Sequence, residues 1–107
     1  MKKLVIGMLI TVSCWAGTQT GSVTEILVRD SDGLIYFFMT NSATNRPDCA
    51  KNTAYWMIHD ENSNVGKQQY SMLLTSLTTG KTIKVSGKND CLRWGDGEDV
   101  QMLHMFQ

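Results

Sequence analysis

The fold is decided by residues 63–87, SNVGKQQYSMLLTSLTTGKTIKVSG, where the type, the start and the end of the structure can all be read. The pattern predicts one helix that runs directly into one strand. Tyr70, Leu73, Leu74 and Leu77 have the i, i+3, i+4, i+7 spacing that aligns apolar side chains along one side of a helix. We therefore expect these four side chains to form its buried face.

Both ends of the helix are marked in the sequence. Asn62 or Ser63 can cap the first turn with a side-chain oxygen. Gly80 can adopt the left-handed conformation that ends a helix. Ile83 and Val85 then alternate with polar residues, which predicts a strand with one apolar face.

The rest of the chain predicts further β-strands, after a mobile, polar lead-in at 17–22. Apolar runs predict three strands before the helix and two after it: 23–29, 34–40, 54–59, 82–86 and 100–106. A helix between the third and fourth of five short strands is the arrangement of the OB-fold, a partly open Greek-key barrel. The predicted class is therefore mainly β with one helix, as an OB-fold-like five-stranded barrel formed by a single domain at 17–107. An α+β sheet with the helix laid across one face is the rival arrangement.

Residues 1–16 have the pattern of a secretory signal peptide. A positively charged start precedes the apolar run 4–12, and cleavage is expected after the small residue Ala16. The run is shorter than the ~20 residues that a membrane-spanning helix needs, so we expect no transmembrane segment in the mature chain. These features predict a secreted or periplasmic protein, with a lipoprotein modified at Cys14 as the alternative.

Two cysteines, Cys49 and Cys91, remain available to one another under either processing. In an exported protein they predict one disulfide bond. The bridge would enclose the whole helix and stabilise the domain by roughly 4 kcal/mol on the loop-entropy model. A redox pair or a zinc site would need closer spacing or more ligands, so we expect neither.

The charge balance argues against nucleic acid as a partner. The chain has ten Lys and Arg against ten Asp and Glu, and removal of Lys2 and Lys3 with the signal leaves eight against ten. Binding to nucleic acid depends on basic residues that neutralise phosphates. A mature chain with a net charge near minus two has no basic surplus for that role.

The titratable residues form no convincing catalytic or metal-binding set. His59, Asp60 and Glu61 are adjacent, but no nucleophile motif accompanies them, so we interpret them as a solvated approach to the helix. His104 lies on an apolar strand face and is expected to be buried and hydrogen-bonded. The acidic residues near the two Asp-Gly turns do not complete a calcium loop: Asp30, Asp32, Asp96, Glu98 and Asp99. We predict no enzymatic activity, no cofactor and no metal.

Aromatic residues are the candidates for ligand binding, because a ring can cover the apolar face of a sugar. We single out Tyr55, Trp56, Arg93 and Trp94, with Tyr36 as a further ring. Trp56 shares its strand face with aliphatic residues, which favours a place in the core. Trp94 lies in a polar loop beside Arg93 and is the better surface candidate, although packing over the disulfide is the favoured interpretation for it.

The chain also resembles a known family. Residues 72–87, MLLTSLTTGKTIKVSG, together with the export signal, the strand order and the two cysteines, resemble the pentameric receptor-binding B subunits of bacterial AB-type toxins, particularly those of subtilase cytotoxin and typhoid toxin. The Cys-x-x-Trp pattern of Cys91 and Trp94 is similar to that of small exported bacterial proteins of unknown function. The resemblance implies a secreted OB-barrel that assembles into a ring and binds cell-surface glycans, with enzymatic activity in a separate A subunit. No stretch matches the family's serine-containing sugar-contacting motif, so the resemblance assigns no glycan-binding residue.

The leading hypothesis is an exported, non-enzymatic binding module for a glycan or another protein, assembled as a homo-oligomer. In a ring like that of the toxin B subunits, the polar side of the helix would line the pore: Lys67, Gln68, Gln69 and Ser71. A small periplasmic or lipid-anchored envelope protein with a structural or inhibitory role is the alternative. An OB-fold hydrolase or nuclease is disfavoured because a convincing catalytic set is lacking.

Overall fold

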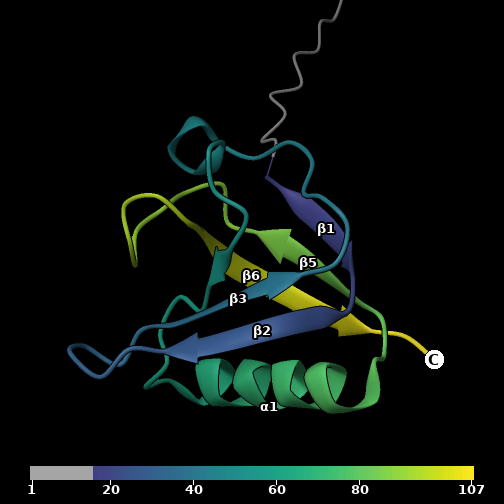
Figure 1. Cartoon of the computed structure of the whole chain (residues 1–107). Helices are drawn as coiled ribbons and strands as arrows, with labels where there is room; N and C mark the ends of the chain where they lie inside the picture. The colour runs from purple at the N-terminus through teal and green to yellow at the C-terminus, as the bar shows by residue number, and fades with distance from the viewer. Residues whose placement is uncertain (1–15) are drawn as a thin grey trace, which may run out of the picture.

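The computed structural model describes residues 16–107, which form six β-strands, one α-helix and a short 3-10 helix (Figure 1). The strands are β1 Thr18–Gly21, β2 Val23–Val28, β3 Ile35–Met39, β4 Trp56–Met57, β5 Ile83–Gly87 and β6 Glu98–Met105; α1 is Asn64–Thr79 and the 3-10 helix is Asp48–Ala50. The predicted class, mainly β with one helix, is confirmed, with six strands in place of five. The predicted signal peptide, Ala16 excepted, lies outside the described residues, as does Cys14.

All six strands belong to one mixed sheet in the order β1-β5-β6-β4-β3-β2. β4 and β6 are parallel, and the other neighbouring strands are antiparallel. The two edge strands, β1 and β2, are consecutive in the chain, and only Ser22 separates them. Because one edge leads straight into the other, the sheet bends round on itself (Figure 1).

β1 corrects the expectation of a mobile lead-in at 17–22. All four of its residues pair with β5 in antiparallel register. The side chain of Gln19 is buried, and its amide donates to the backbone oxygens of Thr40 and Asn41. Strand pairing and a polar side chain hold β1 in place, and neither produces an apolar alternation in the sequence.

The caps of α1 agree with the sequence prediction. Ser63 is the N-cap, and its hydroxyl accepts from the N–H of Gly66 at 2.9 Å. Gly80 ends the helix at φ 79° and donates its N–H to the backbone oxygen of Ser76 at 2.8 Å. A side chain at Gly66 would collide with the backbone of Asp60, so glycine is needed where the chain enters the helix.

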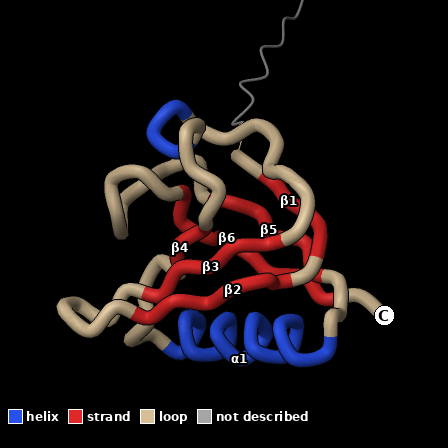
Figure 2. Tube along the Cα trace, in the orientation of Figure 1, coloured by secondary structure: helices blue, strands red, loops and turns tan. Residues whose placement is uncertain are grey.

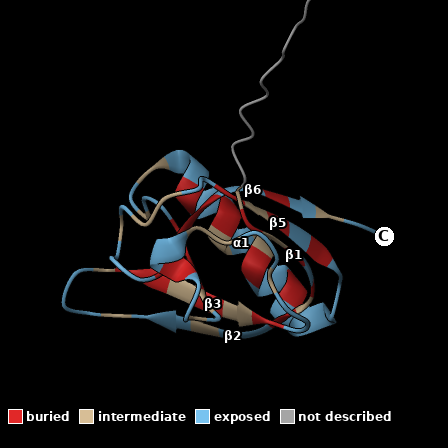
Figure 3. Cartoon of the chain, turned by 90° about the horizontal axis from the view of Figure 1, so that it is seen from above, coloured by how far each residue is buried: buried red, intermediate tan, exposed pale blue. Residues whose placement is uncertain are grey.

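The buried side of α1 is rotated relative to the predicted one. Leu73 is fully buried and Tyr70 packs against the core, as expected. Leu74 and Leu77 are 39% and 40% exposed, so the prediction is wrong for them. The helix lies alongside β2 (Figure 2), and its buried residues are confined to one side (Figure 3).

Two polar side chains occupy the buried side instead. The Ser76 hydroxyl accepts from the N–H of Val23 at 2.9 Å and donates to the backbone oxygen of Lys81 at 2.8 Å. Gln69 is buried, and its amide donates to the backbone oxygen of Gln101 at 3.4 Å. These bonds reach β2 and β6, so they fix which side of α1 faces the sheet.

A bulge in β6 moves His104 to the surface. The register against β5 shifts at Gln101, which is an extra residue on β6. Val100 faces the core before the bulge and Leu103 after it, while the exposed ring of His104 lies 4.4 Å from that of Phe106. The expectation of a buried His104 is wrong because the extra residue reverses the strand alternation.

The core lies inside the bent sheet. Its buried apolar residues come from α1 and from β2 to β6 or the residues next to them: Val23, Ile35, Phe37, Met39, Trp56, Ile58, Leu73, Ile83, Val85, Val100 and Leu103. The predicted disulfide is confirmed, joining Cys49 to Cys91 across 42 residues with 6.3 Å between their Cα atoms. No helix within residues 16–107 is long and apolar enough to cross a membrane.

Candidate functional site

A small hollow on the outer face of β3 and β4 gathers three aromatic rings. Its volume is about 130 Å³. We call the residues that line it the aromatic hollow: Arg29, Leu34, Tyr36, Tyr55, Met57 and Trp94. Tyr36 comes from β3 and Tyr55 from the residue before β4, whereas Arg29 follows β2 and Trp94 belongs to the loop between β5 and β6.

The rings pack edge to face. Alternation along β3 directs Tyr36 and Phe38 away from the core. The ring of Tyr55 packs against both, with centroid distances of 5.4 Å to Tyr36 and 5.6 Å to Phe38. Its hydroxyl donates to Oδ1 of Asp96 at 2.8 Å. Burial and then this hydrogen bond raise the pKa of Tyr55, so the phenol stays neutral and its ring is held in one orientation.

Arg29 covers part of Trp94. The guanidinium carbon lies 4.0 Å from the centroid of the indole ring, which is a cation–π contact. Nε and Nη2 of Arg29 donate to the two carboxylate oxygens of Asp32 at 3.0 and 2.6 Å. This guanidinium, and then the N–H of Leu34, hold the pKa of Asp32 well below its usual range. The turn after β2 therefore fixes a planar cation at the edge of the hollow.

Arg93 supports the hollow from beside it. Its Nε and Nη2 donate to the Glu61 carboxylate at 3.1 Å each, and Nη2 also donates to the backbone oxygen of Asp32 at 3.1 Å. Glu61 and then Asp32 raise the pKa of Arg93 above its usual value. These bonds tie the loop of Trp94 to the turn after β2 and to the approach to α1, so Arg93 is a positioning residue.

The structure brings together three of the four predicted ligand residues. Tyr55 and Trp94 line the hollow, and Arg93 braces it. Trp56 lies elsewhere, because it is fully buried and its indole N–H donates to Oε1 of Gln19 at 2.8 Å. Trp56 thus belongs to the core, as its strand face indicated.

Sequence reasoning did not single out Arg29, Leu34 or Met57. Arg29 stands directly before an Asp-Gly turn, whose acidic residues we considered only as an incomplete calcium loop. Leu34 and Met57 are buried and form the floor of the hollow. A buried residue under a surface site cannot be told from any other core residue in a single sequence.

The titratable run before α1 makes structural contacts. His59 bonds through Nδ1 to the buried carboxylate of Asp99, and Glu61 pairs with Arg93. Asp60 accepts through its side chain from a backbone N–H two residues further on. Within residues 16–107, no three His, Cys, Asp or Glu side chains form a group that could hold a metal ion.

The predicted pore residues do not share one side of α1. Lys67, Gln68 and Ser71 are exposed. Gln69 was expected beside them, and that expectation is wrong because its amide bonds to the backbone of Gln101 beneath the helix.

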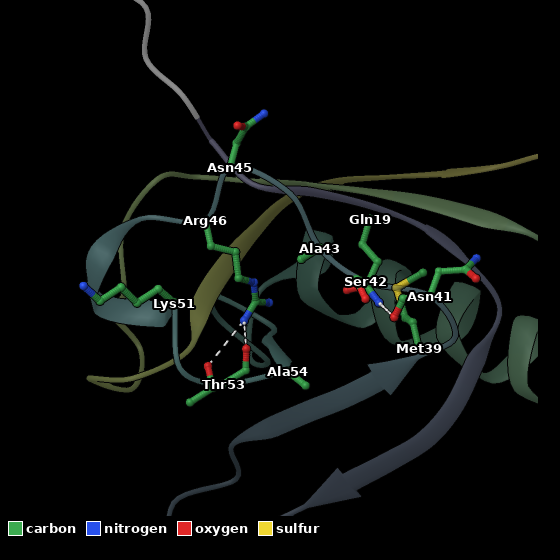
Figure 4. Close-up of a pocket in the computed structure, with 10 residues that line it drawn as sticks. All are labelled: Gln19, Met39, Asn41, Ser42, Ala43, Asn45, Arg46, Lys51, Thr53 and Ala54. Atoms are coloured by element: carbon green, nitrogen blue, oxygen red, sulfur yellow. Dashed lines mark hydrogen bonds between the residues drawn. The ribbon is translucent and has the colours of Figure 1, made fainter.

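A larger cavity of about 470 Å³ lies next to the loop between β3 and β4 (Figure 4). None of its lining residues is aromatic. Arg46 donates to the backbone oxygens of Thr53 and Tyr55, and the amide of Gln19 is likewise bonded to the backbone. Lys51 and Asn45 point away from the other labelled residues (Figure 4). Because both Nη atoms of Arg46 and the amide of Gln19 are already bonded to the backbone and no ring is available for stacking, this cavity is the weaker candidate for a sugar.

No protein-family model, curated protein or solved structure matches the chain, so the resemblance to toxin B subunits remains an expectation from the sequence.

Proposed function

We propose that this protein is an exported, non-enzymatic OB-type domain that binds a saccharide in the aromatic hollow. The observation that carries the proposal is the meeting of three rings, from Tyr36, Tyr55 and Trp94, with the guanidinium of Arg29 around one space. An aromatic face can cover the apolar side of a sugar ring while charged and polar groups bind its hydroxyls. Because about 130 Å³ is smaller than most ligand pockets, we propose that the hollow holds only a single ring at the end of a chain.

The topology supports the OB assignment. If β1 and β2 are counted as one bent first strand, then β3, β4, β5 and β6 are the second to fifth strands. Their circular order is first, second, third, fifth, fourth and back to the first. α1 then stands between the third and fourth strands, as in the OB-fold. Oligosaccharides and oligonucleotides bind OB-folds on strands two and three and at the loops that follow strands one and four. The aromatic hollow occupies that position, and the charge balance disfavours the oligonucleotide.

A glycan array followed by titration of the best glycan, read by tryptophan fluorescence, tests the proposal. Trp94→Ala and Tyr36→Ala should each weaken binding by roughly fivefold or more, because each removes a stacking surface worth over ~1 kcal/mol. Leu92→Ala is the matched control, since Leu92 is 71% exposed in the same loop and lies outside the hollow. Absence of glycan binding, or equal affinity of all four proteins, would contradict the proposal.

We also propose assembly into a homo-oligomeric ring, as the resemblance implies. Exposed apolar side chains on α1 and β2 support a contact between copies: Leu27, Val28, Val65, Leu74 and Leu77. Light scattering on the purified protein tests this part separately. A discrete pentamer agrees with it, whereas a monomer at high micromolar concentration contradicts it and favours a monomeric envelope protein.

A further inference from the structure

The carboxylate of Glu98 is fully buried and incompletely bonded. Its Oε2 accepts from the backbone N–H groups of Gly17 at 3.1 Å and Asn89 at 3.0 Å. Its Oε1 has no hydrogen-bond partner among residues 16–107. Within that range no Lys, Arg or His forms an ion pair with it, and Arg46 acts on it only from a longer distance. A buried carboxylate bonded only by neutral donors is costly.

Hydrogen bonds hold the backbone of Gly17 against this carboxylate. Its backbone oxygen accepts from the N–H of Gly87 at 2.9 Å, and the next residue, Thr18, pairs with both β5 and Thr44. A Cβ at residue 17 would collide with Oε1 of Glu98, so a larger residue there would have to displace this carboxylate. The nitrogen of residue 17 is thereby held in contact with one carboxylate oxygen, with the unpartnered oxygen next to the same residue.

We infer that Gly17 is the first residue of the mature protein and that its free α-ammonium group forms a buried ion pair with Glu98. Hydrolysis of the Ala16–Gly17 peptide bond consumes one water, leaving a carboxylate on Ala16 and an ammonium group on Gly17. The sequence indicates the same bond independently, because Ala16 ends the signal pattern. An ammonium group has three N–H donors in place of one, so it can serve Oε1 as well as Oε2.

The pair makes stability depend on processing at one bond. An unprocessed chain leaves the buried carboxylate with no cation in hydrogen-bond contact, whereas the processed chain supplies one at the contact already present. Processing at Cys14 instead would leave three residues before Gly17 and no charge at its nitrogen. The inference is independent of what the aromatic hollow binds.

Mass spectrometry of the exported protein, together with thermal unfolding of defined chains, tests the inference. The exported protein should begin at Gly17. A chain that begins at Ala16 should unfold about 5 to 10 °C below one that begins at Gly17. In Glu98→Gln versions of both chains that difference should disappear, because the charge partner is gone.

Three results would overturn the inference: export with a different first residue, equal midpoints of the two chains, or a difference that persists in the Glu98→Gln pair and so reflects crowding by the extra residue. NMR titration of the α-amino group covers the case in which Glu98→Gln does not fold. In the protein that begins at Gly17 the α-amino pKa should lie well above that of an ordinary chain terminus. An ordinary value would also refute the ion pair.

Discussion

Two arginine–tryptophan pairs of nearly equal geometry lie in different parts of the molecule. The guanidinium carbon of Arg46 is 4.3 Å from the ring centroid of Trp56, and that of Arg29 is 4.0 Å from the ring centroid of Trp94. Trp56 is fully buried, whereas Trp94 is 38% exposed. We call them the inner pair and the outer pair.

The partners of the two arginines explain the difference in role. Arg46 is bonded to the protein backbone through three oxygens, those of Ala50, Thr53 and Tyr55, and burial lowers its pKa. Arg29 is held by the carboxylate of Asp32, and its ring partner lines an open hollow. The same two types of side chain thus stabilise the interior in one place and lie at the hollow that we propose as a binding site in the other. Burial decides between these roles.

Trp56→Ala should have the largest effect, because it breaks the inner pair. We expect the free energy of unfolding to fall by about 5 kcal/mol, since a large cavity forms and Gln19 loses a hydrogen-bond donor. Urea denaturation measures this loss. Trp94→Ala is the matched control and should cost less than about 1 kcal/mol. Equal losses would show that the two pairs do not differ in the way that their burial indicates.

Removal of the disulfide should have the next largest effect. Cys49 follows the loop of Arg46 and Cys91 precedes Trp94 in its loop, so the bridge joins the two regions. A Cys49→Ser and Cys91→Ser double variant should lose about 4 kcal/mol in urea denaturation. The double variant should also bind any ligand of the aromatic hollow more weakly. Unchanged stability with intact binding would mean that the two regions are independent of the bridge.

Glu98 and Asp32, the acidic groups beside the two pairs, should change the stability with pH in opposite directions. Both effects should be smaller than those of the two variants above. Burial raises the pKa of Glu98 above 4.5 in the chain that keeps residue 16, so the folded state binds this proton more tightly than the unfolded state. Stability should therefore fall as pH rises from 4.5 through the folded pKa. Asp32 has a lowered pKa, so its contribution should be lost as pH falls below 3.8, and its exposure keeps the loss small.

Unfolding midpoints between about pH 2 and 7 check both signs. Glu98→Gln should remove the loss on the rising side, and Asp32→Asn the loss on the acid side. A chain that begins at Gly17 should show a weaker dependence from Glu98 than one that keeps Ala16. If Glu98→Gln leaves the loss of stability at rising pH unchanged, or Asp32→Asn leaves the loss at acid pH unchanged, that loss does not come from the residue to which we assign it.

Residue types at particular positions predicted those parts of the fold that depend on a few residues at a time. The caps at Ser63 and Gly80 and the one disulfide followed from residue type and position. Apolar spacing misplaced the buried side of α1, because Gln69 and Ser76 are satisfied by partners far away in the chain. Such hydrogen bonds leave no periodic pattern in the sequence.

The residues of the candidate site were likewise predicted only in part. Trp94 and Tyr55 were found because aromatic residues in or beside polar loops are unusual enough to notice. Arg29 was missed because its role depends on the approach of two loops that are more than sixty residues apart in the sequence. The acidic residue Glu98 was considered only as a calcium ligand, whereas the structure places it inside the fold against Gly17.

The position of β1 has a consequence for the order in which the chain can fold. Residues 18–21 are synthesised early, yet they pair with β5, and Gly17 bonds to a side chain 81 residues later. The sheet therefore cannot close until almost the whole chain is present, and contacts of such long sequence separation form slowly. For the exported protein that we propose, this delay is useful, because a chain that is still passing through a membrane channel remains unfolded until its last strand has emerged.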